Sequence, residues 1–406
     1  MCKFEVESLN GLVETREGLV RLFLTSQALK PLSERRPKPR VFYNPEASLN
    51  RDIAVLAVRV LSRKRGGDLR VCDPLAGCGV RGIRFLMEGL SVKEAVINDL
   101  NSDALEFIRI NLKANGFSEK AKVFNLDARE LLLRKDIRQD GFDFVDVDPF
   151  GSPAFFIQPA LLSLKIGGVL AVTATDTAPL SGRYPRTCLR RYWSKPLKTE
   201  YYPEVAVRIL LGFIARNCTL LNRGLKPLLV HRTSQYIRVY VETTRGTMAA
   251  EKTLDKLGYL NHCFNCLYRK FVALGDNIVN LCPNCGYRLE WAGPLWIGEL
   301  FDVEFCDQLV VEYKNSHLSS NRRLGKLLET IASESLGDPT YYVIDELASF
   351  LKIPPPSKSL VLEKLREMGY NASPTHFDGK GFRTNAPLRE ILNGINEITR
   401  SLKPTL

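Results

Sequence analysis

Residues 142–151 have the composition of a buried strand that ends in reactive groups. They read FDFVDVDPFG, so an apolar run leads to Asp148, Pro149 and Phe150. A carboxylate at Asp148 would accept a hydrogen bond from an amine and take its proton during or after group transfer to the nitrogen. Pro149 lacks an N–H, which leaves backbone carbonyls free to face the same amine, and Phe150 offers a flat ring for stacking a base. The segment predicts transfer to an exocyclic amine, with Asp148 catalytic. A structural turn with a capped carboxylate is the alternative.

Four cysteines have the spacing of a metal site. Cys263 and Cys266 form one C-x-x-C pair, and after 15 residues Cys282 and Cys285 form a second. This spacing is typical of a four-cysteine zinc ribbon. Because four thiolates complete the tetrahedral coordination of Zn²⁺, the predicted zinc is structural and not catalytic. The alternative is a set of four free or redox-active thiols.

A glycine-rich segment supports two interpretations. Residues 77–82, GCGVRG, match the G-x-G-x-x-G pattern of dinucleotide-binding loops, and Asp99 lies 20 residues after Gly79. However, Asp73 precedes the loop at the predicted strand tip, where its carboxylate would repel a pyrophosphate and favour a cationic ligand. S-adenosylmethionine (SAM) carries an ammonium and a sulfonium, and an acidic residue before a glycine-rich turn is typical of Rossmann-like methyltransferases. We therefore predict SAM as the cofactor, with a nicotinamide or flavin cofactor as the alternative.

Two further predicted strand ends would complete such a pocket. Asp99 follows the apolar run 95–97 and is placed to accept both ribose hydroxyls. Asp127 and Ala128 follow the next strand and can pair with the adenine edge through a carboxylate and a backbone N–H. Ligands of open α/β sheets bind beyond the carboxyl ends of the strands, where these residues would converge. A single Asp at a strand end is more often a turn or cap residue, but three in register with the loop favour a cofactor site.

Short apolar runs predict the strands that must position these groups. Their alternation with helical patterns indicates a parallel sheet covered on both faces. The runs lie at 69–72, 95–97, 122–124, 142–147 and 168–174, and a helix at 204–221 with strands at 228–231 and 236–241 completes the sheet. We predict an α/β fold, a Rossmann-like class I SAM-dependent methyltransferase domain with an N-terminal extension, over residues 1–245.

The composition changes after residue 245, which predicts a smaller α+β domain over 246–406. It contains the zinc ribbon, short strand-like runs at 301–313 and helical patterns at 324–336, 344–351 and 360–368. A glycine-rich turn at 378–381 and a final helix follow. Helices followed by a tight hairpin predict a winged-helix-like module.

The overall charge suits a polyanionic partner. The 406 residues include 57 Lys and Arg against 45 Asp and Glu, a formal net charge of +12. Residues 182–198 concentrate basic and aromatic side chains without an acid, which suits phosphate contact and base stacking, although a solvated charged face is the plainer interpretation. No apolar run reaches the roughly 18 residues of a membrane span, and the start lacks a secretory signal. We expect an intracellular, cytoplasmic protein.

With these residues in place, the chain resembles the tRNA (guanine-N2)-dimethyltransferase family, whose members dimethylate guanine 26 of tRNA, and most of all its archaeal members. The resemblance covers nearly the whole chain. Together its blocks are specific: FYNP at 42–45, NRD at 50–52, GVRGIR at 79–84, ND at 98–99, DA at 127–128 and DPFGSP at 148–153.

The resemblance implies roles for particular residues. Arg51 and Arg81 would bind SAM with Asp99, Asp127 and Ala128, and a guanidinium fork suits the methionine carboxylate. Phe42 and Phe150 would hold the guanine between them, with Asp148 catalytic. The resemblance also implies that the C-terminal domain contributes to tRNA binding. The oligomeric state, of which a monomer is one option, and modification of position 27 are left open.

Three alternatives remain from the residues. The chain is a SAM-dependent amine methyltransferase acting on rRNA, DNA or protein, a non-catalytic RNA-binding protein that retains the fold, or a nicotinamide oxidoreductase. Methylation of a ring carbon is disfavoured because it needs a cysteine near Asp148, and Cys188 is expected in a basic loop instead.

Overall fold

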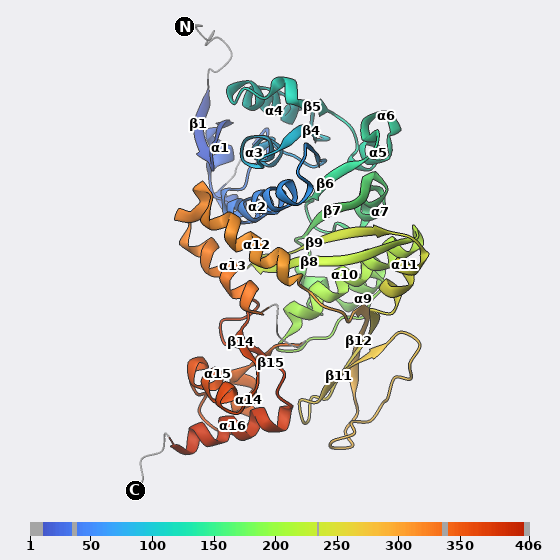
Figure 1. Cartoon of the computed structure of the whole chain (residues 1–406), viewed down its shortest axis with the longest axis vertical. Coiled ribbons are helices and arrows are strands. Elements are labelled where there is room, and N and C mark those ends of the chain that lie inside the picture. Colours follow the sequence, from blue (N-terminus) through green and yellow to red (C-terminus); the bar gives the residue numbers. More distant parts are fainter. Residues whose placement is uncertain (1–10, 35–38, 234, 335–339, 402–406) are drawn as a thin grey trace. The chain divides into compact units, whose positions relative to one another are not determined.

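The computed structural model describes residues 11–34, 39–233, 235–334 and 340–401 (Figure 1). The chain forms two compact units. The first unit comprises Met1–Asp148, Phe155–Ala171 and Val311–Leu324, and the second comprises Pro149–Ala154, Val172–Val310 and Gly325–Leu406.

Parallel strands form the centre of the first unit. They are β3 (Leu69–Asp73), β4 (Val92–Asn98), β5 (Ala121–Phe124) and β6 (Phe142–Val147). β3 pairs with β4 and β6, and β4 also pairs with β5, in each case in parallel. Every residue of β6 is buried, as expected of a strand covered on both faces. The strands predicted from these four apolar runs are therefore present, with ends that differ by at most three residues.

Helices alternate with these strands. α2 is the most buried of them, since every residue from Leu49 to Ser62 is buried. α4 holds the N-terminal hairpin of β1 (Leu12–Glu17) and β2 (Val20–Thr25), because Asn111 and Asn115 accept hydrogen bonds from backbone N–H groups of β2 at 2.7 and 3.0 Å. The helices are α1 (Ser26–Leu29), α2 (Ser48–Arg65), α3 (Val80–Glu88), α4 (Ser102–Ala114), α5 (Ala128–Leu133), α6 (Lys135–Arg138) and α7 (Ala154–Ser163), with short 3₁₀ turns at Leu32–Glu34, Pro45–Ala47 and Ser118–Lys120.

Three more strands extend the main sheet. β7 is Leu164–Ala174, and β8 (Arg223–Thr233) pairs with β9 (Tyr236–Arg245) in antiparallel register. The strand order of the whole sheet is β5-β4-β3-β6-β7-β9-β8. The mixed sheet agrees with the predicted α/β fold class.

The second unit also contains a small three-stranded sheet that carries the cysteines. Its antiparallel strands β10 (Leu257–His262), β11 (Arg269–Ala273) and β12 (Glu290–Trp296) have the order β11-β10-β12. α10 packs closely on it, because a Cβ added at Gly212 would lie 2.9 Å from the Cα of Leu295. The helices that precede this small sheet in the second unit are α8 (Thr177–Leu180), α9 (Pro185–Tyr192), α10 (Tyr202–Leu220) and α11 (Thr247–Leu254).

The C-terminal segment has the predicted order of helices and hairpin. β14 (Ala372–Pro374) and β15 (Gly381–Thr384) pair in antiparallel register, and β13 (Tyr342–Val343) pairs with β15. The helices are α13 (Arg322–Glu334), α14 (Ile344–Leu351), α15 (Lys358–Glu367) and α16 (Leu388–Ser401), with a 3₁₀ turn at His317–Ser320. Residues 335 and 336, at the end of the predicted pattern 324–336, lie outside the described residues.

Two local predictions were wrong. The run 301–313 is not strand-like but contains helix α12 (Val303–Lys314), because its buried side chains Phe305, Leu309 and Tyr313 recur every four residues. β-branched valines in this run favoured the strand interpretation. Cys188 does not lie in a loop but is buried on α9, which begins at Pro185, a residue suited to the first helical position.

In the part of the chain that the structure describes, no helix is both long and apolar enough to cross a bilayer.

Candidate active site and metal centre

The glycine-rich loop is shaped by hydrogen bonds to the strands beside it. Asp73, at the end of β3, accepts from the N–H of Gly82 at 3.1 Å, and the N–H of Gly77 donates to Asp99 Oδ2 at 2.7 Å. Gly77 has φ +56°, and a Cβ there would lie 2.7 Å from the carbonyl oxygen of Phe42. A glycine is required because neither the left-handed conformation nor the close approach tolerates a side chain.

Asn98 joins the loops that follow three neighbouring strands. Its Nδ2 donates to the carbonyls of Pro74 and Leu126 at 2.9 and 3.0 Å, and its Oδ1 accepts from the N–H of Leu126 at 3.0 Å. These bonds hold together the ends of β3, β4 and β5, which carry Asp73, Asp99 and Asp127. No role was predicted for Asn98, although an asparagine directly after the apolar run 95–97 was a signal in the sequence; in the structure its amide is fully buried and fully paired.

Asp99 and Asp127 are each held by backbone groups. Asp99 Oδ1 accepts from the N–H of Asn101 at 2.8 Å, and each carboxylate oxygen has capacity for a further hydrogen bond. Asp127 caps α5 and accepts from the N–H of Arg129 at 2.8 Å. The side-chain hydrogen bond from Arg129 lowers the pKa of Asp127 to about 2, so this carboxylate is ionised at neutral pH. Ala128, next in the chain, is buried.

Arg81 connects the predicted catalytic carboxylate to a second one. Its guanidinium is buried and pairs with Asp148 and, at 3.1 Å, with Asp146, which is completely buried two residues earlier. Asn50 Oδ1 accepts from the same guanidinium at 3.0 Å. The side chain of Asp148 remains 26% exposed, so it can reach a substrate. Sequence reasoning brought Arg81 and Asp148 to the same cleft but missed Asp146 and Asn50.

Arg51 belongs to a neighbouring cluster of buried charges. It donates to Glu17 at 2.5 and 2.6 Å and to the carbonyl of Asn44 at 2.8 Å, and it lies over the ring of Tyr43. Burial is the largest single effect and raises the pKa of Glu17, but the charges of Arg51 and Arg84 and the hydrogen bonds from Arg51 and Tyr43 together outweigh it, and the net pKa is lowered. Glu17 comes from the N-terminal hairpin, where no pattern in the sequence indicated a buried acid.

The net pKa shift of Asp73 has the opposite sign to that of Glu17. Desolvation raises the pKa of this carboxyl to about 7, although the positive charge of Arg81 partly opposes the shift. Asp73 therefore titrates near neutral pH.

The two predicted aromatic contacts belong to different units. Phe42, in the first unit, is 38% exposed, and Phe150, in the second, is 78% exposed. The residues after Phe150 are anchored within the second unit, because the N–H of Gly151 donates to Thr175 Oγ1 at 2.7 Å and Ser152 Oγ donates to the hydroxyl of Tyr192 at 2.8 Å. The turn after Asp148 is thus held by side chains.

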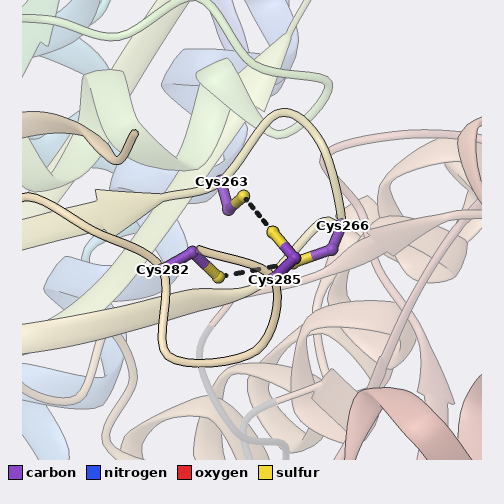
Figure 2. A group of neighbouring side chains, drawn as sticks. All are labelled: Cys263, Cys266, Cys282 and Cys285. Carbon is purple, nitrogen blue, oxygen red and sulfur yellow. Dashed lines mark hydrogen bonds between the residues drawn. The ribbon is translucent and has the colours of Figure 1, made fainter. Parts of the chain in front are cut away.

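The four cysteines of the predicted zinc site come together. Figure 2 shows Cys263 and Cys266 from one loop facing Cys282 and Cys285 from another, and their Sγ atoms all lie within 4.8 Å of one another. Tetrahedral thiolate coordination with Zn–S near 2.3 Å places sulfurs about 3.8 Å apart, so the residues fit the ion.

Both cysteine loops have the same backbone design. The N–H of Leu267 donates to the carbonyl of Cys263, and the N–H of Gly286 donates to the carbonyl of Cys282, each at 2.9 Å. Leu267 and Gly286, four residues after those cysteines, both have positive φ, at 61° and 71°. His262 does not join the cluster in the structure, because its Nδ1 hydrogen-bonds the hydroxyl of Tyr201 at 2.9 Å. The donor set is four thiols.

A sheet with parallel central strands, a glycine-rich loop and acidic residues at three strand ends defines the class of Rossmann-like methyltransferases. Residues 26–396 match the family model described as "N2,N2-dimethylguanosine tRNA methyltransferase". The chain belongs to this family.

Individual relatives agree over most of the chain. A tRNA (guanine(26)-N(2))-dimethyltransferase of Methanobrevibacter smithii is 37% identical over 89% of this chain and 92% of its own length. A tRNA (guanine(26)-N(2)/guanine(27)-N(2))-dimethyltransferase of Aquifex aeolicus is also 37% identical, over 94% and 95%. The structure of Trm1 from Pyrococcus horikoshii in complex with SAM superposes with a TM-score of 0.82 and 32% identity, covering 95% of this chain and all of that one.

These matches confirm the family resemblance and the fold class predicted from the sequence. They do not test the roles of single residues, which stay predictions, as does the domain boundary at residue 245.

Proposed function

We propose that this protein transfers two methyl groups from SAM to the exocyclic N2 of guanine 26 in tRNA. The observation that carries the proposal is the turn 148–150, in which a partly exposed carboxylate is paired with a buried arginine and followed by an exposed aromatic ring. Family membership supports the substrate, because the relatives with this name cover nearly the same length of chain.

The strand-end residues fit SAM as a ligand. When bound, SAM supplies an electrophilic methyl group on a sulfonium. Asp99 would accept both ribose hydroxyls, and Asp127 with the N–H of Ala128 would pair with the adenine edge. Arg81 and Arg51 would face the methionine carboxylate. Both guanidinium groups are already oriented by carboxylates, so little side-chain entropy is lost on binding.

Asp148 would act on the substrate amine. The lone pair of an exocyclic amine is delocalised into the ring, which makes the nitrogen a poor nucleophile. A hydrogen bond from the N–H to Asp148 favours pyramidalisation, and the carboxylate takes the proton that leaves as the N–C bond forms. The carbonyl of Pro149 would hold the second N–H, while Phe42 and Phe150 contact the faces of the guanine. The target base must leave its stack to reach Asp148.

The remaining parts of the chain would serve tRNA binding. We propose that residues 246–406 form a separate domain with a structural zinc ion on Cys263, Cys266, Cys282 and Cys285 and a winged-helix-like region. The protein would act in the cytoplasm, where its substrate occurs.

Mass mapping of a tRNA transcript after reaction with SAM tests the substrate. We expect N2,N2-dimethylguanosine at position 26, and the same digest shows whether guanine 27 is also modified. Methylation confined to rRNA, DNA or protein would overturn the proposal. Stabilisation by NAD and not by SAM would instead support an oxidoreductase.

An Asp148→Ala variant tests the catalytic assignment. Methyl transfer should fall by at least 10²-fold, while the Kd for SAM changes little, because Arg81 keeps its contacts with Asp146 and Asn50. Asp140→Ala, which removes an exposed acid from the same unit, is the control and should retain full activity. Unaltered turnover of the Asp148 variant would contradict the assignment.

A further inference from the structure

One stretch of the second unit is strongly basic, and two of its arginines form no ion pair with the described residues. Between Asp176 and Glu200 the chain has no acidic residue and carries Arg183, Arg186, Arg190, Arg191, Lys195 and Lys198. Arg191 donates to Asp176 at 3.0 Å, and Lys195 lies 3.4 Å from Glu290. Arg186 and Arg190 are exposed, and neither forms an ion pair with another described residue. They lie one turn apart on α9, so their charges face outward side by side.

The same stretch also has large exposed side chains, two of them aromatic. Trp193 is 69% exposed, Leu189 is 55% exposed and Tyr184 is 52% exposed. Trp193 ends α9 with φ 52°, a conformation that costs energy for a residue with a side chain. Its backbone is nevertheless held, because its N–H donates to the carbonyl of Leu189 at 2.9 Å and its carbonyl accepts from Arg216 at 3.0 Å. The exposed indole therefore projects from an anchored backbone position.

The buried side of α9 is tied to the turn that follows Asp148 in the chain. The hydroxyl of Tyr192 donates to Asp176 Oδ1 at 2.7 Å and accepts from Ser152 Oγ at 2.8 Å. All three residues belong to the second unit. Through Ser152, the position of α9 and that of the residues 149–152 are linked by side-chain hydrogen bonds.

We propose that the exposed face of α9 and Trp193 is a contact surface for tRNA, in which Arg186 and Arg190 bind backbone phosphates and Trp193 stacks on a base. Arginines bind phosphates, and an exposed aromatic ring stacks on an unpaired base. An acidic protein would satisfy the arginines, but exposed aromatic rings at Tyr184 and Trp193 interleaved with arginines suit the bases and phosphates of RNA, so RNA is the favoured partner. The inference rests on the proposed function, which supplies tRNA as the polyanion.

Binding of a tRNA transcript to the full chain at several KCl concentrations tests the phosphate contacts. Arg186→Gln/Arg190→Gln should weaken binding about tenfold or more near physiological salt. The slope of log K against log salt should become shallower by roughly 1.4 to 1.8, at about 0.7 to 0.9 per lost contact. Arg109→Gln/Lys113→Gln is the matched control, because it removes two exposed charges with the same spacing from α4. Equal behaviour of the two double variants would overturn the surface.

Trp193 variants test the stacking contact. Trp193→Ala should raise the Kd for tRNA about tenfold at constant salt slope, whereas Trp193→Phe, which keeps an aromatic face, should restore most of the affinity. Unchanged tRNA binding by Trp193→Ala would show that the stacking contact is wrong.

The two proposals fail in different ways. All of these variants should bind SAM as tightly as the unaltered chain. If the unaltered chain dimethylates guanine 26 and the α9 variants bind tRNA normally, only the surface is wrong. If α9 governs tRNA affinity but no methylated guanine forms, the proposed reaction is wrong and the surface stands.

Discussion

Asp73 shows how burial changes a single carboxyl group. It is 2% exposed at the end of β3, and desolvation raises its pKa to about 7, against an ordinary value near 3.9. Between these two values the folded chain holds a proton that the unfolded chain has lost. The contribution of Asp73 to stability is therefore fully present below about pH 4 and is lost as the pH rises through 7.

An Asp73→Asn variant should remove this dependence. Relative to the variant, the unaltered chain should lose roughly 1.4 kcal/mol of unfolding free energy per pH unit between about pH 4 and 7, and the difference should level off above that range. Urea denaturation of both proteins from pH 5 to 8 measures it. Asp140→Asn, at an exposed position, should leave the pH profile unchanged. Parallel profiles for Asp73→Asn and the unaltered chain would contradict the shifted pKa.

At the scale of elements, α9 is positioned by its buried side. Tyr192 is completely buried and its hydroxyl joins Ser152 to Asp176, while burial also raises the pKa of Asp176. These hydrogen bonds tie the residues after Asp148 to α9.

A Tyr192→Phe variant should separate attachment from charge. We expect kcat for tRNA methylation to fall about tenfold with little change in the Kd for tRNA, because the arginines remain but the residues after Asp148 lose a constraint. Leaving Asp176 and Ser152 without this partner should also cost about 1–3 kcal/mol of unfolding free energy.

Tyr313→Phe controls for the stability loss. This tyrosine is also buried, and its hydroxyl donates to the carbonyl of Ser319 at 2.9 Å. It should lower stability by a similar amount and leave kcat unchanged. An equal loss of kcat in both variants would mean that the Tyr192 effect is only one of stability.

The zinc ribbon is the other element whose integrity can be tested directly. Few apolar side chains hold its loops: the buried cluster there consists of Cys263, Cys282 and Leu289, with Cys266 and Tyr268 packed against it. A small element of this kind depends on its metal for folding.

Removal of the metal should therefore unfold this element. Cys282→Ser should lower the bound zinc from one ion per chain to less than half, and the Tm should fall by several degrees, as it should on chelation of the unaltered chain. Metal analysis and thermal denaturation measure both. Cys306→Ala, at a buried cysteine outside the cluster, should keep its zinc. Full zinc content in Cys282→Ser would exclude the four-thiolate site.

At the scale of the whole chain, charges from distant segments meet in the core of the second unit. Arg383 of β15 pairs with Glu334 of α13 at 2.7 Å and with Glu204 of α10 at 2.8 Å, and all three are at most 2% exposed. Burial raises the pKa of Glu334, but the interactions with His376, Arg383 and Thr375 together outweigh it and lower the pKa to about 2. Both carboxylates are therefore ionised in the core.

An Arg383→Met variant should be strongly destabilised, because it leaves two buried carboxylates without their shared cation. We expect a loss of about 3–5 kcal/mol in the free energy of unfolding. Lys364→Met is the control, since it breaks the more exposed pair with Glu397 and should cost less than about 1 kcal/mol. Urea denaturation at pH 7 compares them, and equal small losses would show that the buried network does not hold these segments together.

Local patterns in the sequence predicted much of the fold and of the candidate site. Apolar runs predicted β3 to β7 because strands covered on both faces are rich in apolar residues, although β6 also contains the buried Asp143 and Asp146, and the strand-end acids followed from the same pattern. The cysteine spacing predicted the metal site because two C-x-x-C turns are short-range features. The strand prediction at 301–313 failed because composition and periodicity disagreed there, and the helical spacing of buried residues decided the outcome.

The sequence by itself determined which groups this protein has for chemistry: an acid-proline-aromatic turn, acids after apolar strands, and four thiols at metal-binding spacing. Only the tertiary structure decided their partners, such as Asn98 for the strand-end loops, Glu17 for Arg51, and Asp146 with Asp148 for Arg81. The reason is physical. Strand and turn preferences act over a few neighbouring residues, whereas a buried charge is paired with whatever opposite charge the packed chain brings within reach.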